Sequence, residues 1–132
     1  MALTSTKLTN NQQTVLDLLE NAKEPLKAYK ILFDTQKKGI TAPPQVYRAL
    51  DKLIEIGKVH KIESKNSYIA CTHKNCNSST NTAFLICETC DHVSELTQKN
   101  LPFYFAKQSE QADFKYAKHN LEIYGVCKDC TK

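Results

Sequence analysis

Four of the six cysteines in this 132-residue chain form two C-x2-C pairs, a spacing that suits a tetrahedral metal site. The pairs are Cys87 with Cys90 and Cys127 with Cys130. Each pair places two thiolates on one side of a tight turn, and two such turns supply the four sulfur ligands of a closed zinc site. A dithiol redox centre is the alternative, but it normally uses only one such pair. We therefore predict a structural zinc bound by these four cysteines.

A second group of possible metal ligands comprises two histidines, two further cysteines and a carboxylate: His60, Cys71, His73, Cys76 and Glu95. Each of them alone carries little weight, because a lone histidine is more often a surface or core residue. As a group they lie around the junction of the two domains that we expect from the elements below. Imidazole, thiolate and carboxylate together suit zinc better than calcium or magnesium. A metal bound there would couple its occupancy to the relative orientation of the domains.

The elements that must position these residues begin with three short helices, expected at about residues 9–22, 25–39 and 41–57. Thr9 and Gln12 form a capping box for the first helix, and prolines open the second and third. In the second helix we expect one apolar face, made of Leu26, Tyr29, Leu32 and Phe33. A β-hairpin over residues 58–63 and 67–71 follows. Three helices and a hairpin are the order of a winged helix-turn-helix.

The second half of the chain must fill the 36 residues between the two C-x2-C pairs, a longer gap than in a compact zinc ribbon. We expect strands at 83–86 and 93–96, a helix at about 99–112 and a last strand at 114–124. The predicted fold class is therefore α+β, with an N-terminal winged helix-turn-helix and a small α/β dimerisation domain that holds the structural zinc. The expected boundaries are 1–71 for the DNA-binding domain, 72–82 for a polar hinge linker and 83–132 for the dimerisation domain.

The third helix has one apolar face and one polar face. The apolar residues repeat at helical spacing, and the opposite side carries polar side chains: Val46, Leu50, Leu53 and Ile54 against Gln45, Arg48 and Lys52, with Tyr47 at the margin. In a major groove arginine can bind guanine, glutamine can pair with adenine, and lysine can contact phosphate. A solvated face on a core helix is the alternative. We expect this face to bind double-stranded DNA.

Charge and composition support this assignment and exclude others. Residues 1–70 carry 11 Lys/Arg against 7 Asp/Glu, whereas residues 71–132 carry 7 of each, so the excess positive charge lies in the half expected to bind DNA. We expect a cytoplasmic protein with no membrane partner, because no apolar run suits a membrane span or a secretory signal. We expect neither enzymatic activity nor a small-molecule substrate, because no acid–base pair or nucleophile motif is present and three glycines scarcely permit a phosphate loop.

Several sequence runs resemble the ferric uptake regulator superfamily and, within it, the zinc uptake regulators. These runs are QVYRAL at 45–50, GKVHKIES at 57–64, NSYIAC at 66–71, FLICETC at 84–90 and HNLEIYGVCKDC at 119–130. The resemblance extends over nearly the whole chain, in the family's order. It implies a homodimer that, when loaded with zinc, binds AT-rich inverted repeats and represses zinc-acquisition genes.

The resemblance also implies roles for particular residues. It implies two zinc sites per chain, with the four C-x2-C cysteines in the structural site and His60, Cys71 and Glu95 in a regulatory site. Thr80 occupies a position where the family often has a histidine ligand, so we assign the fourth regulatory ligand to Cys76, with His73 as the alternative. Two other functions stay open: a regulator of another metal, and a DNA-binding protein whose zinc is only structural.

Overall fold

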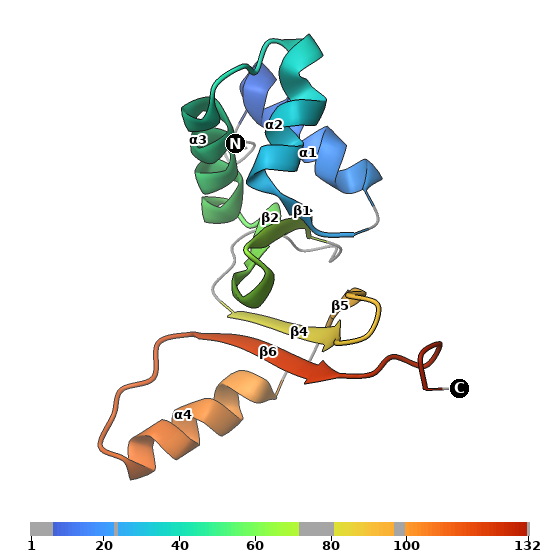
Figure 1. Cartoon of the computed structure of the whole chain (residues 1–132). Coiled ribbons are helices and arrows are strands. Elements are labelled where there is room, and N and C mark those ends of the chain that lie inside the picture. The colour runs from blue at the N-terminus through green and yellow to red at the C-terminus, as the bar shows by residue number, and fades with distance from the viewer. Residues whose placement is uncertain (1–6, 23, 72–80, 97–99, 132) are drawn as a thin grey trace. The chain divides into compact units, whose positions relative to one another are not determined.

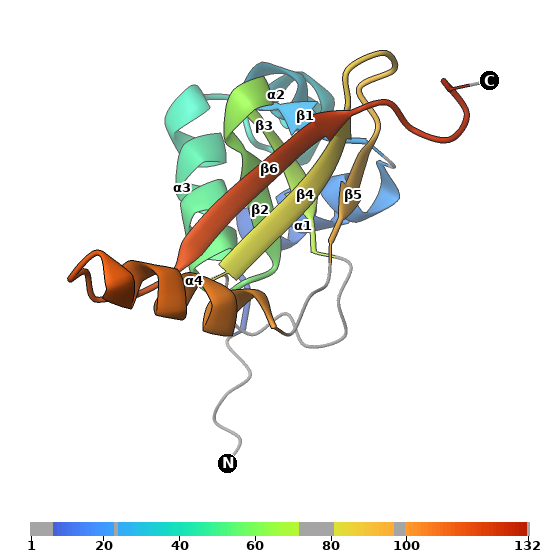
Figure 2. The ribbon, with the colours of Figure 1, turned by 90° about the horizontal axis from the view of Figure 1, so that it is seen from below.

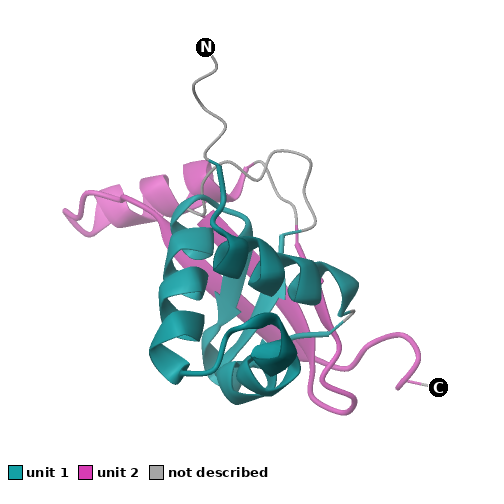
Figure 3. Ribbon diagram, turned by 90° about the horizontal axis from the view of Figure 1, so that it is seen from above, with its two compact units in different colours: residues 1–79 teal, residues 80–132 magenta. Residues whose placement is uncertain are grey.

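The computed structural model describes residues 7–22, 24–71, 81–96 and 100–131. The chain divides into two compact units, Met1–Ser79 and Thr80–Lys132, which are shown in teal and magenta in Figure 3. Among the described residues, no helix has the length and apolar character that crossing a bilayer requires. The two units are described separately below.

Among its described residues, the first unit contains three α-helices, α1 (Asn10–Asn21), α2 (Ala28–Thr35) and α3 (Pro43–Glu55) (Figure 1). The predicted capping box of α1 is confirmed: the Gln12 amide donates to Thr9 Oγ1 at 3.2 Å, and the Thr9 amide donates to Gln12 Oε1 at 3.0 Å. The prolines at 43 and 44 occupy the first turn of α3, as predicted. They are tolerated there because the first amides of a helix have no intrahelical acceptor.

A small antiparallel sheet follows the helices, with β3 (Ser67–Ala70) between β1 (Leu26–Lys27) and β2 (Val59–Ile62). The predicted hairpin is present, and its turn is a short 3-10 helix that ends at Asn66 in the left-handed region. The prediction that the second helix begins at Pro25 was wrong. Leu26 and Lys27 instead pair with Tyr68 and Ser67 of β3, so their backbones are extended and α2 begins at Ala28.

The core of the first unit lies between the three helices and one face of this sheet. Val15, Leu19, Ile31, Leu50, Leu53 and Val59 are almost completely buried in it. The apolar face predicted for the second helix was wrong for Tyr29 and Phe33, which are 73% and 68% exposed, whereas Leu26 and Leu32 pack against the core as predicted. The fully buried residues of α2 are Ile31 and Thr35, which are four positions apart. On α3, Val46, Leu50 and Leu53 are buried as predicted, and the opposite side of the helix remains accessible.

In the part that the structure describes, the second unit is a three-stranded sheet with one helix (Figure 2). The central strand β4 (Asn81–Cys87) pairs antiparallel with β5 (Val93–Glu95) and parallel with β6 (His119–Gly125). Helix α4 (Leu101–Gln111) lies in the connection from β5 to β6. This mixed helix-and-strand unit has the α/β character that the sequence predicted.

The last strand begins later than predicted, at His119 rather than at residue 114. The amides of Asp113 and Phe114 donate to the carbonyls of Glu110 and Ser109, so both residues terminate α4 instead of joining a strand. Asp113 has a φ of 57°, which turns the chain away from the helix axis. Pairing then starts where the partner strand starts, with Asn81 opposite His119.

Candidate metal centre and nucleic-acid interface

The two C-x2-C pairs meet because β4 and β6 run parallel. Cys87 is the last residue of β4 and pairs with Gly125, the last residue of β6, so both strands end at the same edge of the sheet. The Glu88 amide extends the pairing by donating to the Gly125 carbonyl at 2.8 Å. Each strand then turns into its own cysteine pair. The ligand atoms of Cys87, Cys90, Cys127 and Cys130 all lie within 4.8 Å of one another.

The sulfur separations fit a tetrahedral zinc ion. Cys90 Sγ lies 3.7 Å from Cys127 Sγ. A zinc–sulfur bond of about 2.3 Å gives a tetrahedron whose sulfurs are about 3.8 Å apart. Four free cysteine sulfurs within 4.8 Å of one another, one pair of them at this separation, make a donor set that suits structural zinc.

Backbone amides at this centre favour the ionised form of one thiol. Cys87 Sγ accepts from the amides of Cys127 at 3.3 Å, Cys90 at 3.5 Å and Thr89 at 3.4 Å. The hydrogen bonds from the Cys127 and Cys90 amides are the main reason that the pKa of Cys87 is lowered to about 6. Side-chain hydrogen bonds with Cys127 and Cys90 favour the protonated form of Cys130 and raise its pKa to about 12. The four thiols therefore do not all ionise in the absence of a cation. A divalent metal bound among them would supply the positive charge that stabilises the four thiolates.

The first cysteine turn contains an unusual backbone conformation. Asp91 has a φ of 65°, in the left-handed region, and its amide donates to the Cys87 carbonyl at 3.0 Å. Glycine adopts this conformation without the steric cost that a Cβ brings. Asp91 thus closes the turn in the conformation that orients Cys87 and Cys90.

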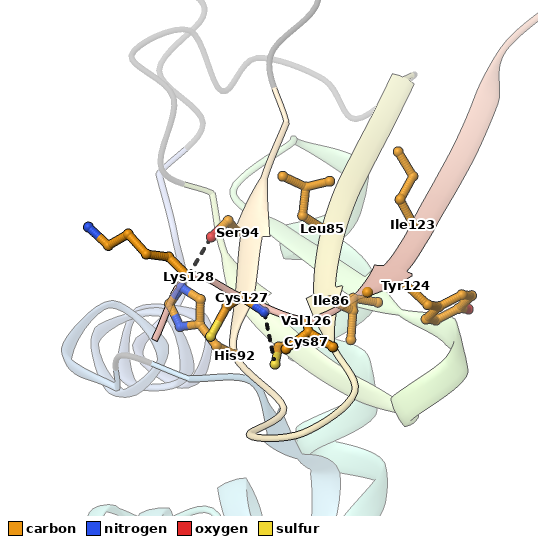
Figure 4. Close-up of a pocket in the computed structure, with 11 residues that line it drawn as sticks. Leu85, Ile86, Cys87, His92, Ser94, Ile123, Tyr124, Val126, Cys127 and Lys128 are labelled. Atoms are coloured by element: carbon orange, nitrogen blue, oxygen red, sulfur yellow. Dashed lines mark hydrogen bonds between the residues drawn. The ribbon is translucent and has the colours of Figure 1, made fainter. Parts of the chain in front are cut away.

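A groove of about 310 Å³ lies beside this centre (Figure 4). Leu85 on β4 and Ile123 on β6 project into it from neighbouring strands, and Tyr124 and Val126 extend its apolar wall. At its other end, His92 and Ser94 are joined by a hydrogen bond of 3.1 Å. The groove is therefore mostly apolar, with polar groups at one end only.

Two of the predicted regulatory ligands lie together on the hairpin of the first unit. His60 on β2 pairs with Ile69 on β3, and the Cys71 amide extends the ladder by donating to the Lys58 carbonyl at 2.9 Å. Because side chains alternate along a strand, Cys71 projects from the same face as Ile69 and His60. Ligand atoms of His60 and Cys71 lie within 4.8 Å of each other. His60 is only 5% exposed, and Cys71 is partly exposed.

The remaining predicted regulatory ligands belong to other parts of the chain. Of the other predicted ligands, Glu95 is the last residue of β5 in the second unit, while His73 and Cys76 lie outside the described residues.

The polar face of α3 presents the predicted DNA-binding residues unequally. Tyr47 is 48% exposed, Arg48 is exposed, and Lys52 Nζ lies 3.2 Å from Glu55 Oε2. Gln45 Oε1 accepts from the amides of Thr41 at 2.8 Å and Ala42 at 2.9 Å. Gln45 therefore closes the start of α3, a role that its position in the first turn after two prolines could have indicated.

Arg48 also lines a smaller polar groove of about 220 Å³ in the first unit, together with Gln12 and Asn11 of α1 and Gln45 of α3. The groove joins the exposed face of α3 to the first turn of α1. The fold and the four-cysteine cluster together define a winged-helix protein whose second unit carries a candidate metal centre.

The chain belongs to the ferric uptake regulator family. The model of the Ferric uptake regulator family matches residues 4–124. The zinc uptake regulation protein of Escherichia coli (strain K12) is 32% identical over 127 residues, which are 96% of this chain and 74% of that protein. The predicted resemblance is therefore confirmed.

Two solved structures agree with the fold. A zinc uptake regulator complexed with zinc and DNA superposes with a TM-score of 0.87 at 30% identity, and covers 98% of this chain and 87% of its own. The holo form of XcZur gives a TM-score of 0.86 at 35% identity, over 96% of this chain and 88% of its own. The predicted fold class is confirmed by this agreement.

Proposed function

We propose that this protein is a zinc-responsive transcriptional repressor that binds operator DNA as a homodimer and controls zinc uptake genes. The observation that carries the proposal is the agreement along 98% of the chain with a zinc uptake regulator solved with zinc and DNA. Curated zinc uptake regulation proteins from two bacteria are also 32% identical to it. As a member of a family of regulators, the protein is not an enzyme.

The first zinc has a structural role and is held by Cys87, Cys90, Cys127 and Cys130. What supports this assignment is the cluster of four ligand atoms within 4.8 Å of one another at the shared edge of β4 and β6. Zinc bound there links the end of the chain to the central strand. The second unit buries few apolar side chains, and small units of this kind usually depend on a metal or a partner for stability.

The second zinc is regulatory, and His60, Cys71 and Glu95 are its proposed ligands, with Cys76 as the fourth and His73 as the alternative. The proximity of His60 and Cys71 on one face of the hairpin supports the first two. Because those two belong to the first unit and Glu95 belongs to the second, one ion held by all three would restrict the relative motion of the units. Such a restriction would fix the spacing of the two DNA-binding units in a dimer.

Arg48 and Tyr47 are the proposed base-contacting residues, and Lys52 the proposed phosphate contact. Arg48 is exposed on the face of α3 opposite the core, and its guanidinium can bind guanine with two hydrogen bonds. Gln45 was also predicted to contact DNA. Its amide oxygen is used in the α3 cap, so we now propose that Gln45 mainly positions the helix.

The second unit carries the dimerisation surface. Helix α4 has no buried residue among those described, and its Phe103 and Tyr104 are 78% and 57% exposed. Leu85 and Ile123 line the apolar groove of the adjacent sheet and are also exposed. A second copy of the unit would remove these side chains from water, which favours a homodimer.

The test is the zinc content of the reduced protein set against binding to an AT-rich inverted-repeat duplex, before and after a mild chelator. We expect two zinc ions per chain, loss of one on chelation, and loss of DNA binding together with it. Retention of full DNA binding after that loss would leave a DNA-binding protein with structural zinc only. Recovery of binding with iron but not zinc would identify a regulator of another metal.

A further inference from the structure

We propose that the polar groove between α1 and α3 is a binding site for one phosphate of the DNA backbone. The inference rests on the proposed function, because it names the part of the DNA that this groove holds. The groove has a volume of about 220 Å³. It is lined by side chains from α3, from α1 and from the residue that precedes α1: Thr9, Asn11, Gln12, Gln45, Arg48 and Ala49.

The side-chain amides of two glutamines in this groove have a fixed orientation. Gln12 Oε1 accepts the hydrogen bond from the Thr9 amide at 3.0 Å. Gln45 Oε1 accepts those from the Thr41 and Ala42 amides at 2.8 and 2.9 Å. A backbone N–H can bond only to the oxygen of a side-chain amide, so the oxygen is the atom turned toward each cap. The NH2 end of each amide is therefore the group left for a ligand.

The groove offers mainly hydrogen-bond donors. Within the described part of the chain, the Nε2 groups of Gln12 and Gln45 have no acceptor. The side chains of Asn11 and Arg48 form no hydrogen bond or ion pair with other described residues. The described residues that line the groove include no aspartate or glutamate. Amide nitrogens and guanidinium groups carry only donors, so a fitting ligand has several acceptor oxygens, and the charge of Arg48 favours an anion.

The position of the groove indicates that this anion is part of the DNA. Arg48 lines the groove and is exposed on the side of α3 opposite the buried residues Val46 and Leu50. A helix that lies in the major groove has the sugar–phosphate backbone along its flanks. Phosphate oxygens accept about half to two-thirds of protein–DNA hydrogen bonds together with the sugars, and asparagine and glutamine are among the donors.

Each of the two glutamines therefore has a separate role for each end of its amide. The oxygen caps the start of a helix, and the nitrogen binds the phosphate. A phosphate contact carries no sequence information, but it fixes the register of the protein on the duplex. The contact would hold α3 in the position from which Arg48 reads its base pair. A substitution that changes only the nitrogen separates folding from DNA binding.

Gln12→Glu and Gln45→Glu are the variants that make this separation. Each carboxylate keeps the acceptor that the cap needs, and glutamate is a common residue at the Gln12 position of a capping box. We expect urea midpoints close to the wild-type value. Affinity should fall by about 10-fold or more, and by similar factors for the AT-rich inverted repeat and a scrambled duplex. Gln36→Glu makes the same change at an exposed residue outside the groove and should keep most of the affinity, because salt screens its charge.

A second measurement locates the phosphate and avoids any added charge. The phosphates of the inverted-repeat duplex are replaced one at a time by uncharged methylphosphonates, and each duplex is titrated with the zinc-loaded protein. We expect the wild type to lose affinity by about 10-fold at one position in each half-site. Asn11→Ala removes a donor whose side chain has no partner among the described residues, so the variant should fold normally and lose this sensitivity at that same position.

The two measurements decide the inference together. It is overturned if stable Gln12→Glu protein binds both duplexes as tightly as Gln36→Glu does, or if Asn11→Ala keeps the full wild-type sensitivity at every phosphate. If a glutamate variant proves less stable than the wild type, the methylphosphonate result for Asn11→Ala decides alone. The proposed function fails separately, when the zinc-loaded wild-type protein binds neither duplex.

Discussion

The Gln45→Ala substitution distinguishes two possible roles of Gln45: a cap at the start of α3, or a contact to DNA bases. Gln45 Oε1 accepts two hydrogen bonds, from the Thr41 amide at 2.8 Å and the Ala42 amide at 2.9 Å. Both amides precede α3, where no intrahelical acceptor is available. In Gln45→Ala they lose this acceptor, and the start of α3 loses its cap.

The size of the effect follows from these contacts. A hydrogen bond contributes about 0.5–1.5 kcal/mol and a capping side chain about 1 kcal/mol, so we expect the free energy of unfolding of the first unit to fall by about 1–2 kcal/mol. With a urea dependence of about 1–3 kcal/mol per M, the midpoint should fall by roughly 0.5–1 M. Affinity for DNA should fall by a similar factor for specific and scrambled duplexes.

The assay combines urea unfolding followed by circular dichroism with titrations of fluorescent duplexes that differ at single base pairs. Gln45→Glu is the matched control, because its carboxylate keeps an acceptor for the two amides and should preserve most of the stability. A Gln45→Ala protein with unchanged stability and an altered preference at one base pair would refute the capping assignment. Gln45 would then be a base reader.

Further predictions concern the other proposed residues. Arg48→Ala should leave folding unchanged, because Arg48 has no ion pair among the described residues, and should reduce discrimination at one base pair by about 1–3 kcal/mol, or roughly 5- to 150-fold, in the same duplex titrations. Cys127→Ser should lose the tightly bound zinc and broaden the nuclear magnetic resonance signals of the second unit, and an unchanged zinc content would exclude Cys127 as a ligand. In metal-free protein, Cys87 should ionise with a midpoint near pH 6, seen as thiolate ultraviolet absorbance. Because this folded-state pKa lies below the ordinary value of 9.0, the stability that ionised Cys87 contributes is fully present above pH 9 and fades as pH falls to about 6, and a midpoint near 9 would contradict the assignment. Leu85→Glu should convert the proposed dimer to a monomer in analytical ultracentrifugation, whereas Glu110→Gln, on exposed α4, should not.

The parts of the fold that sequence reasoning predicted correctly are those fixed by local chemistry. Thr9 and Gln12 cap each other within one turn, and the prolines of α3 occupy positions where they cost little. The errors concern residues whose state depends on distant partners. Leu26 joins a strand because β3 lies beside it. Periodicity alone does not show whether Tyr29 and Phe33 of α2 face the core or the solvent.

The same contrast between local chemistry and distant partners applies to the candidate sites. A C-x2-C pair can be recognised as a possible metal-binding motif from four residues, but only the parallel pairing of β4 with β6 brings the two pairs together. His60 and Cys71 are 11 positions apart in sequence, and the hairpin register places them on one face. The choice of Cys76 or His73 as the fourth ligand stays a prediction, because both lie outside the described residues.

Native mass spectrometry of the protein–DNA complex across a zinc titration measures the link between metal occupancy and DNA binding directly. Reduced protein is mixed with an AT-rich inverted-repeat duplex, and the zinc ions in each DNA-bound species are counted from its mass. We expect the bound species to contain two chains and two zinc ions per chain, and to disappear when each chain retains only the ion at Cys87, Cys90, Cys127 and Cys130. An equally abundant complex with one zinc ion per chain would show that the second site does not control DNA binding.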